Sequence, residues 1–215
     1  METLRSHQPL SKKEAHKTAL ELLKEVGIPE GQEKWYPFEL SGGECQRIGI
    51  ALAMCNHPRL LIADEPVSAL DATLQAQILD LLQQMKQRHN LALLLISHDL
   101  PLISRMADRI CVMYHGRIVE SGPSSAVFAS PAHPYTRGLI RSQPELRHHH
   151  ETNTLEAIPG SMPFPGEDSP GCMFAPRCGE AIPQCSEKIP DERALSKTHW
   201  ASCIKIIGRD KGGEE

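Results

Sequence analysis

The sequence lacks several features that mark common classes of protein. No apolar run approaches the roughly 20 residues that cross a bilayer. The opening residues, METLRSHQPLSKKEAHK, contain no apolar segment of the kind found in a secretory signal. The formal net charge of −4 argues against nucleic acid as a partner, because nucleic-acid-binding domains are usually basic. Together these absences predict a cytoplasmic protein.

The phosphate-cradling motif G-x-x-x-x-G-K-[ST] is also absent. Nevertheless, Ser41, Gly42 and Gly43 stand just before an apolar helical pattern. A helix start with unpaired N–H groups and a positive dipole end attracts anions. A helix that simply begins at Ser41 as its N-cap would explain the same residues without any ligand. The chain therefore has a candidate phosphate site but no loop to hold a nucleotide of its own.

The apolar pattern alternates between helical and strand periods, with Ser11 and Glu14 forming a capping box at the first helix. The predicted elements are helices at 11–26 and from 42 to about 56, a strand at 60–63, a helix at 71–89, a strand at 91–97, a helix up to 107 and a strand–turn–strand at 109–119. The first two strands are apolar on both faces, as in a buried parallel sheet. The fold class predicted is α/β with a mainly parallel sheet.

Acidic and basic groups follow both predicted parallel strands. Asp64 and Glu65 come directly after the first strand, and His98 ends the second. Ligands gather at the carboxyl ends of parallel strands, where an aspartate can help hold Mg²⁺ and a glutamate can polarise an attacking water. An acidic pair is often a helix N-cap, and a lone histidine is often structural, so neither signal decides the function by itself.

Four motifs occur together, in order, between residues 40 and 99: LSGGECQR, LLIADEP, SALD and SHD. This combination resembles the ATP-binding subunits of ABC transporters, with their signature, Walker B strand, D-loop and switch histidine. The resemblance implies a P-loop-NTPase-like nucleotide-binding domain that hydrolyses ATP with Mg²⁺. It implies catalytic roles for Glu65 and His98, Mg²⁺ at Asp64, a D-loop role for Asp71, and contact with a partner subunit's nucleotide for Ser41, Gly42, Gly43 and Gln46.

The segment GRIVESGPSSAVFASPAHPYTRGLIRSQP and the later GCMFAPRCGEAIPQC resemble the dipeptide, oligopeptide and nickel importers of that family. Peptide is the cargo expected, and nickel is the alternative. The resemblance implies a second ATPase subunit, transmembrane permease subunits and, indirectly, a solute-binding protein as partners. It implies a location on the cytoplasmic face of a bacterial inner membrane.

Four of the seven cysteines cluster near the end of the chain at Cys172, Cys178, Cys185 and Cys203. A loop-rich segment that could hardly form its own core suggests a metal staple. The spacing lacks the C-x₂-C pairs of zinc ribbons, and some importers of this branch carry a [4Fe–4S] cluster here. An iron–sulfur cluster is therefore preferred to zinc, and four reduced, unliganded thiols are the alternative.

The domains expected are a portion of a nucleotide-binding domain at 1–142, a linker at 143–168, a Cys-rich region at 169–207 and a disordered tail at 208–215. Compared with complete subunits, the sequence lacks the phosphate loop, the glutamine loop and the adenine-stacking aromatic residue. We therefore expect the C-terminal portion of a subunit, with exposed apolar surface and no ATP turnover by itself. Two further hypotheses stay open: a non-catalytic module that lends its signature to a partner or docks on a permease, and an iron–sulfur protein on a remnant ATPase scaffold.

Overall fold

The computed structural model describes residues 1–143, 157–164, 166, 169–206 and 209–210. The chain divides into two units, Met1–His98 and Asp99–Glu215, which we describe separately. Residues 144–156, 165 and 167–168 of the predicted linker, residue 207 of the predicted Cys-rich region, and residues 208 and 211–215 of the predicted tail lie outside the described residues. In the described part of the chain, no helix is long and apolar enough to cross a membrane.

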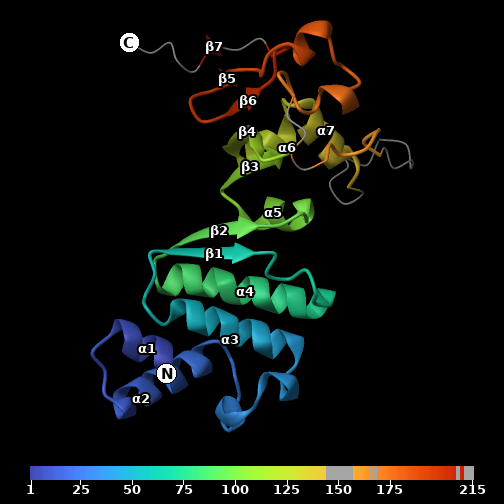
Figure 1. Ribbon diagram of the computed structural model, residues 1–215. Coiled ribbons are helices and arrows are strands. Elements are labelled where there is room, and N and C mark those ends of the chain that lie inside the picture. Colours follow the sequence, from blue (N-terminus) through green and yellow to red (C-terminus); the bar gives the residue numbers. More distant parts are fainter. Residues whose placement is uncertain (144–156, 165, 167–168, 207–208, 211–215) are drawn as a thin grey trace. The chain divides into compact units, whose positions relative to one another are not determined.

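Unit 1 is built from helices and one pair of strands (Figure 1). Its elements are α1 (Glu2–His7), α2 (Lys12–Glu25), the 3-10 turns η1 (Gln32–Lys34) and η2 (Pro37–Glu39), α3 (Gly42–Met54), β1 (Leu60–Asp64), α4 (Ala72–Arg88) and β2 (Ala92–Ile96). The capping box of Ser11 and Glu14 opens α2 as predicted. The predicted helices and strands of this unit are thus confirmed, with small shifts at their ends.

The strands β1 and β2 pair in parallel, with Asp64 opposite Ile96 at their carboxyl ends. The prediction that both faces are buried is wrong. Side chains on one face remain about half exposed: Leu60 (51%), Ile62 (58%), Leu94 (48%) and Ile96 (45%). They share a face because alternate residues of a strand point the same way. The helices α3 and α4 lie to one side of the pair (Figure 1), which leaves the apolar side chains of the other face uncovered within this unit.

Unit 2 contains an antiparallel sheet in the order β3-β4-β6-β5-β7. Its elements are α5 (Leu100–Met106), β3 (Arg109–Tyr114), β4 (Arg117–Pro123), α6 (Ser124–Ala129), α7 (Pro134–Arg141), the 3-10 turns η4 (Ala175–Arg177) and η5 (Pro183–Ser186), β5 (Glu192–Ala194), β6 (Trp200–Ser202) and β7 (Arg209–Asp210). The predicted hairpin turn is confirmed, because His115 and Gly116 both have the positive φ that such a turn needs.

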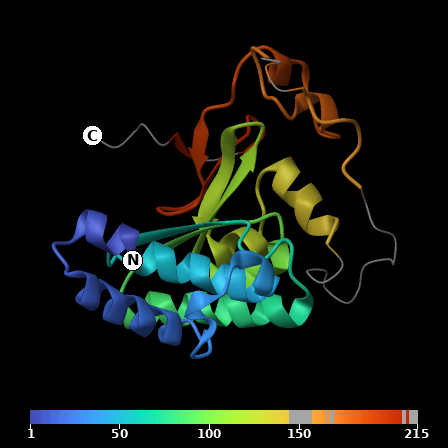
Figure 2. The same ribbon diagram turned by 60° about the horizontal axis from the view of Figure 1, so that its bottom comes forward.

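The cysteine-bearing segment joins the sheet of unit 2 instead of standing apart from it. Strand β6 pairs with β4, matching Ala201 to Glu120, and β5 pairs with β6 (Figure 2). Residues 209–210, which fall in the predicted disordered tail, form β7 against β5. These strands were not predicted, because two or three residues are too few to establish a period.

Aromatic packing ties this segment into the core of unit 2. The ring of Phe174 lies 5.3 Å from that of Tyr114, 5.4 Å from that of Tyr135 and 5.9 Å from that of His133. Aromatic pairs at such separations add to the gain from area burial. Phe174 therefore brings β3, the start of α7 and the cysteine segment into one hydrophobic cluster.

A buried carboxylate, Glu120 of β4, connects the same parts through hydrogen bonds. It is fully buried and accepts from the backbone N–H groups of Ala132 and His133, both at 2.9 Å. Its Oε1 lies 2.8 Å from Nε2 of His199. A buried charge is tolerated only when it is hydrogen-bonded in this way.

His133 is held neutral at this junction. The pKa of His133 is lowered to about 4, mainly by burial; Glu120 opposes the shift, and Arg137 adds to it. Its Nδ1 accepts from the N–H of Tyr135, which caps α7. Because the folded pKa lies below the usual 6.5, the unfolded chain binds more protons between these values. The stabilisation is complete above pH 6.5 and is lost as the pH falls toward 4.

We predict that His133→Asn makes unit 2 less sensitive to acid. Asparagine is a good N-cap but does not titrate. Between pH 7 and pH 5 the parent should lose roughly 2 kcal/mol more stability than the variant. Urea unfolding followed by Trp200 fluorescence in a Trp35→Phe background measures this, and each protein serves as its own reference at pH 7. Parallel pH dependences in the two proteins would contradict the assignment.

Candidate functional site

The start of α3 is capped by its own side chains. Oγ of Ser41 accepts from the N–H of Glu44 at 3.2 Å, and Oε2 of Glu44 accepts from the N–H and Oγ of Ser41 at 2.8 and 2.7 Å. The hydrogen bonds from the backbone and hydroxyl of Ser41 lower the pKa of Glu44. The anion position at this helix start is thus occupied by a carboxylate of the chain itself, and the Ser41 hydroxyl is not a vacant donor.

The two glycines of this turn differ in their surroundings. Gly43 is buried, and a Cβ there would stand 3.1 Å from Cδ2 of Leu74 in α4. Gly42 is exposed, with Leu70 at 3.5 Å from the corresponding position. Gly43 therefore serves the close packing of α3 on α4, and Gly42 leaves the helix start open to an approaching group. Gln46, also predicted to meet nucleotide, is half-buried one turn further along.

The structure brings Glu65 and His98 together. Glu65 follows β1 and is held to β2 by its N–H, which donates to the carbonyl of Ile96 at 2.9 Å. Its Oε1 accepts from the N–H of His98 at 3.1 Å and lies 2.8 Å from Nδ1 of the same residue. The parallel register places both residues at the same edge of the strand pair.

The backbone of Glu65 is strained and is held by a serine. Glu65 has a φ of 47°, in the left-handed region that non-glycine residues seldom adopt. The N–H and the hydroxyl of Ser68 both donate to its carbonyl, at 3.3 and 3.2 Å. Such strain persists where the surroundings over-determine it, often at functional sites. Sequence reasoning missed this positioning role of Ser68, which entered only as the first letter of SALD.

The two other acids of the predicted site have separate surroundings. Asp64 ends β1 with its side chain exposed. Asp71 is the N-cap of α4, where Oδ1 accepts from the N–H groups of Thr73 and Leu74 at 3.0 and 2.9 Å. Asp64 therefore has an exposed carboxylate at the strand edge, whereas the carboxylate of Asp71 caps the start of α4.

Four of the cysteines of unit 2 line one small cavity of about 20 Å³: Cys172, Cys178, Cys185 and Cys203. The N–H of Cys172 donates to the carbonyl of Cys185 at 2.7 Å, and a Cβ at Gly171 would come 2.2 Å from that carbonyl, so this crossing requires glycine. Burial raises the pKa of the Cys172, Cys178 and Cys203 thiols. In the part of the chain that the structure describes, no group of three or more His, Cys, Asp or Glu residues could hold a metal ion as it stands.

Comparison with known families and proteins covers most of the chain. The family described as "ABC transporter" matches residues 1–68, and the one described as "Oligopeptide/dipeptide transporter, C-terminal region" matches residues 119–185. Over these residues the chain is similar to ABC transporter subunits. The predicted signature at Ser41–Gly43 and the predicted Walker B strand, β1, both lie within the first match. The nucleotide-binding and catalytic roles of the individual residues stay predictions.

Two relatives give the extent of the similarity. A putative peptide import ATP-binding protein of Brucella melitensis is 46% identical over 210 residues, which are 95% of this chain and 62% of that protein. Another, from Brucella suis, is 47% identical over 88% of this chain and 57% of that protein. This chain thus spans about three-fifths of the length of these relatives. A solved dimeric bacterial ABC transporter cassette is 31% identical, with a TM-score of 0.48 over 54% of this chain and 49% of that chain.

We predict that Ser41→Ala loosens the first turn of the ABC signature helix. Loss of an N-cap side chain costs about 1 kcal/mol. Amide hydrogen exchange at Glu44 should accelerate about fivefold, because the free energy of opening this turn falls by the same 1 kcal/mol, roughly. Ser41→Thr keeps the hydroxyl acceptor and is the matched control. Equal acceleration in the alanine and threonine variants would show that the cap does not hold this turn.

Proposed function

We propose that this chain acts as part of an ATP-binding subunit that energises the import of di- and oligopeptides. The names of the two Brucella relatives, and the match of residues 119–185 to an oligopeptide/dipeptide transporter region, support peptide over nickel as the cargo. The partners proposed are a second ATPase subunit, membrane permease subunits and, through them, a solute-binding protein. The location proposed is the cytoplasmic face of the inner membrane.

The pairing of Glu65 with His98 is the observation that carries this proposal. Glu65 would polarise the attacking water, and a base in that role contributes about 10²–10⁴ in rate. The hydrogen bonds with His98 hold the carboxylate, and the one from the Ser68 hydroxyl to the Glu65 carbonyl holds the backbone that carries it. Asp64, exposed at the same strand edge, fits a ligand to Mg²⁺, which prefers carboxylate and water oxygens. Bound MgATP would supply the phosphoryl group that the water attacks.

The helix start at Ser41 would meet a nucleotide carried by the partner subunit. The exposed Gly42 leaves room for a phosphate, and the helix N-terminus favours a negative charge. Glu44 occupies the same end of the helix, so a phosphate would have to share or displace its hydrogen bonds from Ser41. This gives the signature two arrangements, one closed on Glu44 and one opened toward a phosphate.

The uncovered face of the β1–β2 pair supports completion of the site by further polypeptide. Parallel strands are ordinarily covered on both faces, whereas Leu60, Ile62 and Leu94 are about half exposed. A segment that carries G-x-x-x-x-G-K-[ST] would supply both the cover and the phosphate contacts that this sequence lacks. The absence of that motif from the sequence also favours the second candidate, a non-catalytic module that lends its signature to a partner's nucleotide.

We predict that the 215-residue chain alone shows no steady ATP turnover. Adding a complementing segment with G-x-x-x-x-G-K-[ST] as a separate polypeptide should restore turnover, measured by phosphate release. Glu65→Gln should then lower the rate by about 10²-fold or more, as expected for a general base. The exposed Glu39→Gln is the matched control.

Two results would revise this picture. Turnover by the chain alone, abolished by Glu65→Gln, would contradict its predicted incompetence. Stimulation of a complete partner subunit that is lost in Gly42→Asp but unchanged in Glu65→Gln would favour the non-catalytic module.

We further propose that Cys172, Cys178, Cys185 and Cys203 bind a [4Fe–4S] cluster, with zinc as the alternative. Two observations support this proposal. The four cysteines line one cavity, and four thiols match the Cys₄ ligation of such clusters. Because burial raises the pKa of three of these thiols, loading must remove protons, and affinity should increase with pH. The cavity of about 20 Å³ has room for little more than one water. The cysteine loops must therefore move apart on loading.

We predict that anaerobically purified chain contains iron and acid-labile sulfide in a one-to-one ratio, with little zinc. Elemental analysis and visible absorption provide the measurement. Cys172→Ser should lose most of the iron, whereas Cys111→Ser, which alters an exposed cysteine of β3 in the same unit, should keep it. Iron content that is unchanged in Cys172→Ser would exclude the cluster, and stoichiometric zinc would replace it with the alternative.

A further inference from the structure

Two of the cysteines at the small cavity of unit 2, Cys172 and Cys185, are in direct backbone contact. The N–H of Cys172 donates to the carbonyl of Cys185 at 2.7 Å. Standard bond lengths then keep the two Cα atoms within about 6.6 Å of each other. Disulfides join cysteines whose Cα atoms are roughly 4.4–6.8 Å apart. The backbone spacing of this pair therefore permits a disulfide.

The two residues also border one small space. Both line the cavity of about 20 Å³, and both thiols are free. Burial is the main cause that raises the pKa of the Cys172 thiol, and among the neighbouring thiols Cys185 adds most to the shift. In the part of the chain that the structure describes, this pair is the one among the four cysteines that a backbone hydrogen bond joins. The two thiols thus have little distance to cover.

Each cysteine of the pair is held by a turn of its own. The carbonyl of Cys172 accepts from the N–H of Ala175 at 2.9 Å. The N–H of Cys185 donates to the carbonyl of Ile182, also at 2.9 Å. The crossing of the two segments is thus fixed before any bond forms. Such preorganisation gives each thiol a high effective concentration near the other.

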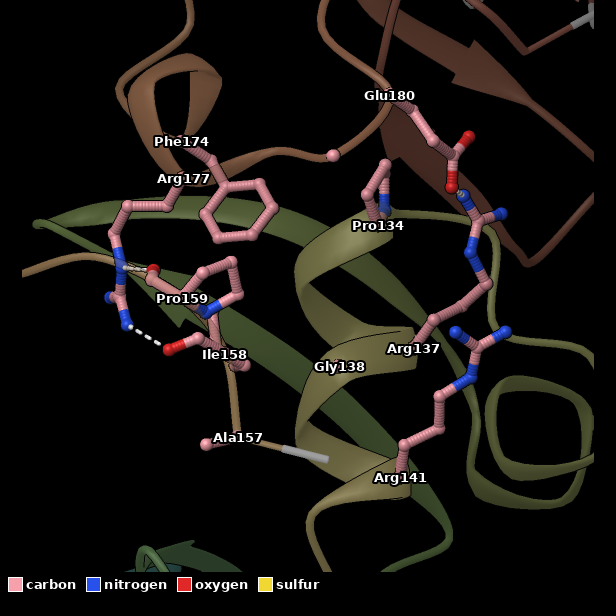
Figure 3. A pocket seen from close by; sticks show the side chains of 11 residues that line it. Pro134, Arg137, Gly138, Arg141, Ala157, Ile158, Pro159, Phe174, Arg177 and Glu180 are labelled. Carbon is pink, nitrogen blue, oxygen red and sulfur yellow. Dashed lines mark hydrogen bonds and ion pairs between the residues drawn. The ribbon is translucent and has the colours of Figure 1, made fainter. Parts of the chain in front are cut away.

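The loop between the two cysteines is anchored to the rest of unit 2. Phe174 is one of the buried residues of the hydrophobic core. Arg177 donates from Nε to the carbonyl of Pro159 at 2.9 Å, and Glu180 forms an ion pair with Arg137 of α7 (Figure 3). These contacts hold the middle of the loop in place while its two ends cross.

The two thiols differ in their access to small oxidants. Cys172 is half-buried, whereas Cys185 is only 7% exposed. A peroxide in solution therefore reaches Cys172 first. A thiol oxidised to a sulfenic acid condenses with a second thiol close by to form a disulfide. Cys185 is placed to be that second thiol.

We propose that Cys172 and Cys185 are a redox pair that closes to a disulfide when a peroxide oxidises the metal-free chain. The sulfur of Cys172 attacks one oxygen of hydrogen peroxide, the O–O bond breaks, and the other oxygen leaves as water with the thiol proton. The sulfur of Cys185 then attacks the sulfenic acid at Cys172. The S–S bond forms, and the sulfenic hydroxyl leaves with the second thiol proton as water. Two electrons pass from the sulfurs to the peroxide oxygens, and a dithiol reverses the bond by exchange.

The disulfide uses two of the four thiols proposed for a metal, so the disulfide and that metal exclude each other. The inference does not rest on the metal or on the transported cargo, because it concerns the metal-free chain. A failure to find iron in the purified protein therefore leaves it untouched.

Peptide mapping of the full chain tests this proposal. The chain is stripped of metal with EDTA, reduced, treated with hydrogen peroxide and blocked with a maleimide before digestion and mass spectrometry. It should lose two of its seven thiols, with the Cys172–Cys185 link as the main product, and dithiothreitol should restore both.

Variants separate the two steps of the reaction. Cys185→Ser should increase the Cys172 sulfenic acid captured by dimedone about tenfold, because the condensing thiol is lost. Cys172→Ser, at the more exposed position of the pair, should leave the Cys185 thiol reduced. The matched control is Cys178→Ser, which alters another cysteine of the same cavity and should keep the link. Urea unfolding followed by Trp200 fluorescence confirms that each variant is folded.

Two results would overturn the proposal. One is a main product in which Cys178 or Cys203 takes the place of either member of the pair. The other is a parent chain in which Cys172 and Cys185 stay reduced while the exposed Cys111 is oxidised.

Discussion

Glu120 accepts hydrogen bonds from the N–H groups of Ala132 and His133 and lies 2.8 Å from Nε2 of His199, with no part of its side chain exposed. These partners come from the loop before α7 and from the turn that leads into β6. Removing one of these partners leaves the buried carboxylate with an unsatisfied oxygen, which typically costs several kcal/mol of folding stability. The Glu120 carboxylate therefore brings the loop before α7 and the turn before β6 together at β4. The aromatic cluster around Phe174 fills the space between these segments.

Unit 1 has a different organisation, in which the candidate site depends on strand register. Asp64 lies opposite Ile96, so the residues that follow each strand, Glu65 and His98, must come close together. Two hydrogen bonds from Ser68 hold the strained backbone of Glu65, and His98 holds its carboxylate. At the other element of the site, Glu44 satisfies the helix start of α3 from within. Both elements are thus preorganised by contacts within the chain.

The elements that could be predicted from the sequence are those that local apolar periodicity and turn residues determine. The helices and the parallel pair of unit 1 follow from apolar spacing, and the hairpin turn follows from His115 and Gly116. The meeting of Glu65 with His98 was predictable only as two strand ends on one edge. The role of Glu120 was not predictable, because a glutamate in a strand normally indicates a solvent-facing position. Its burial depends on His199, 79 residues further along the chain, and no local pattern records such a pairing.

The packing of unit 2 removes one reason for expecting a metal at Cys172, Cys178, Cys185 and Cys203. From the sequence we expected this loop-rich segment to need a metal, because it could hardly form a core of its own. In the structure Phe174 packs in the core of the β3–β4 hairpin, and β6 pairs with β4. The segment thus obtains its core from the rest of unit 2, so that reason does not hold. A metal bound by these cysteines would act on loops already anchored at both ends, and the free energy of its binding would go into moving those loops rather than into folding the segment.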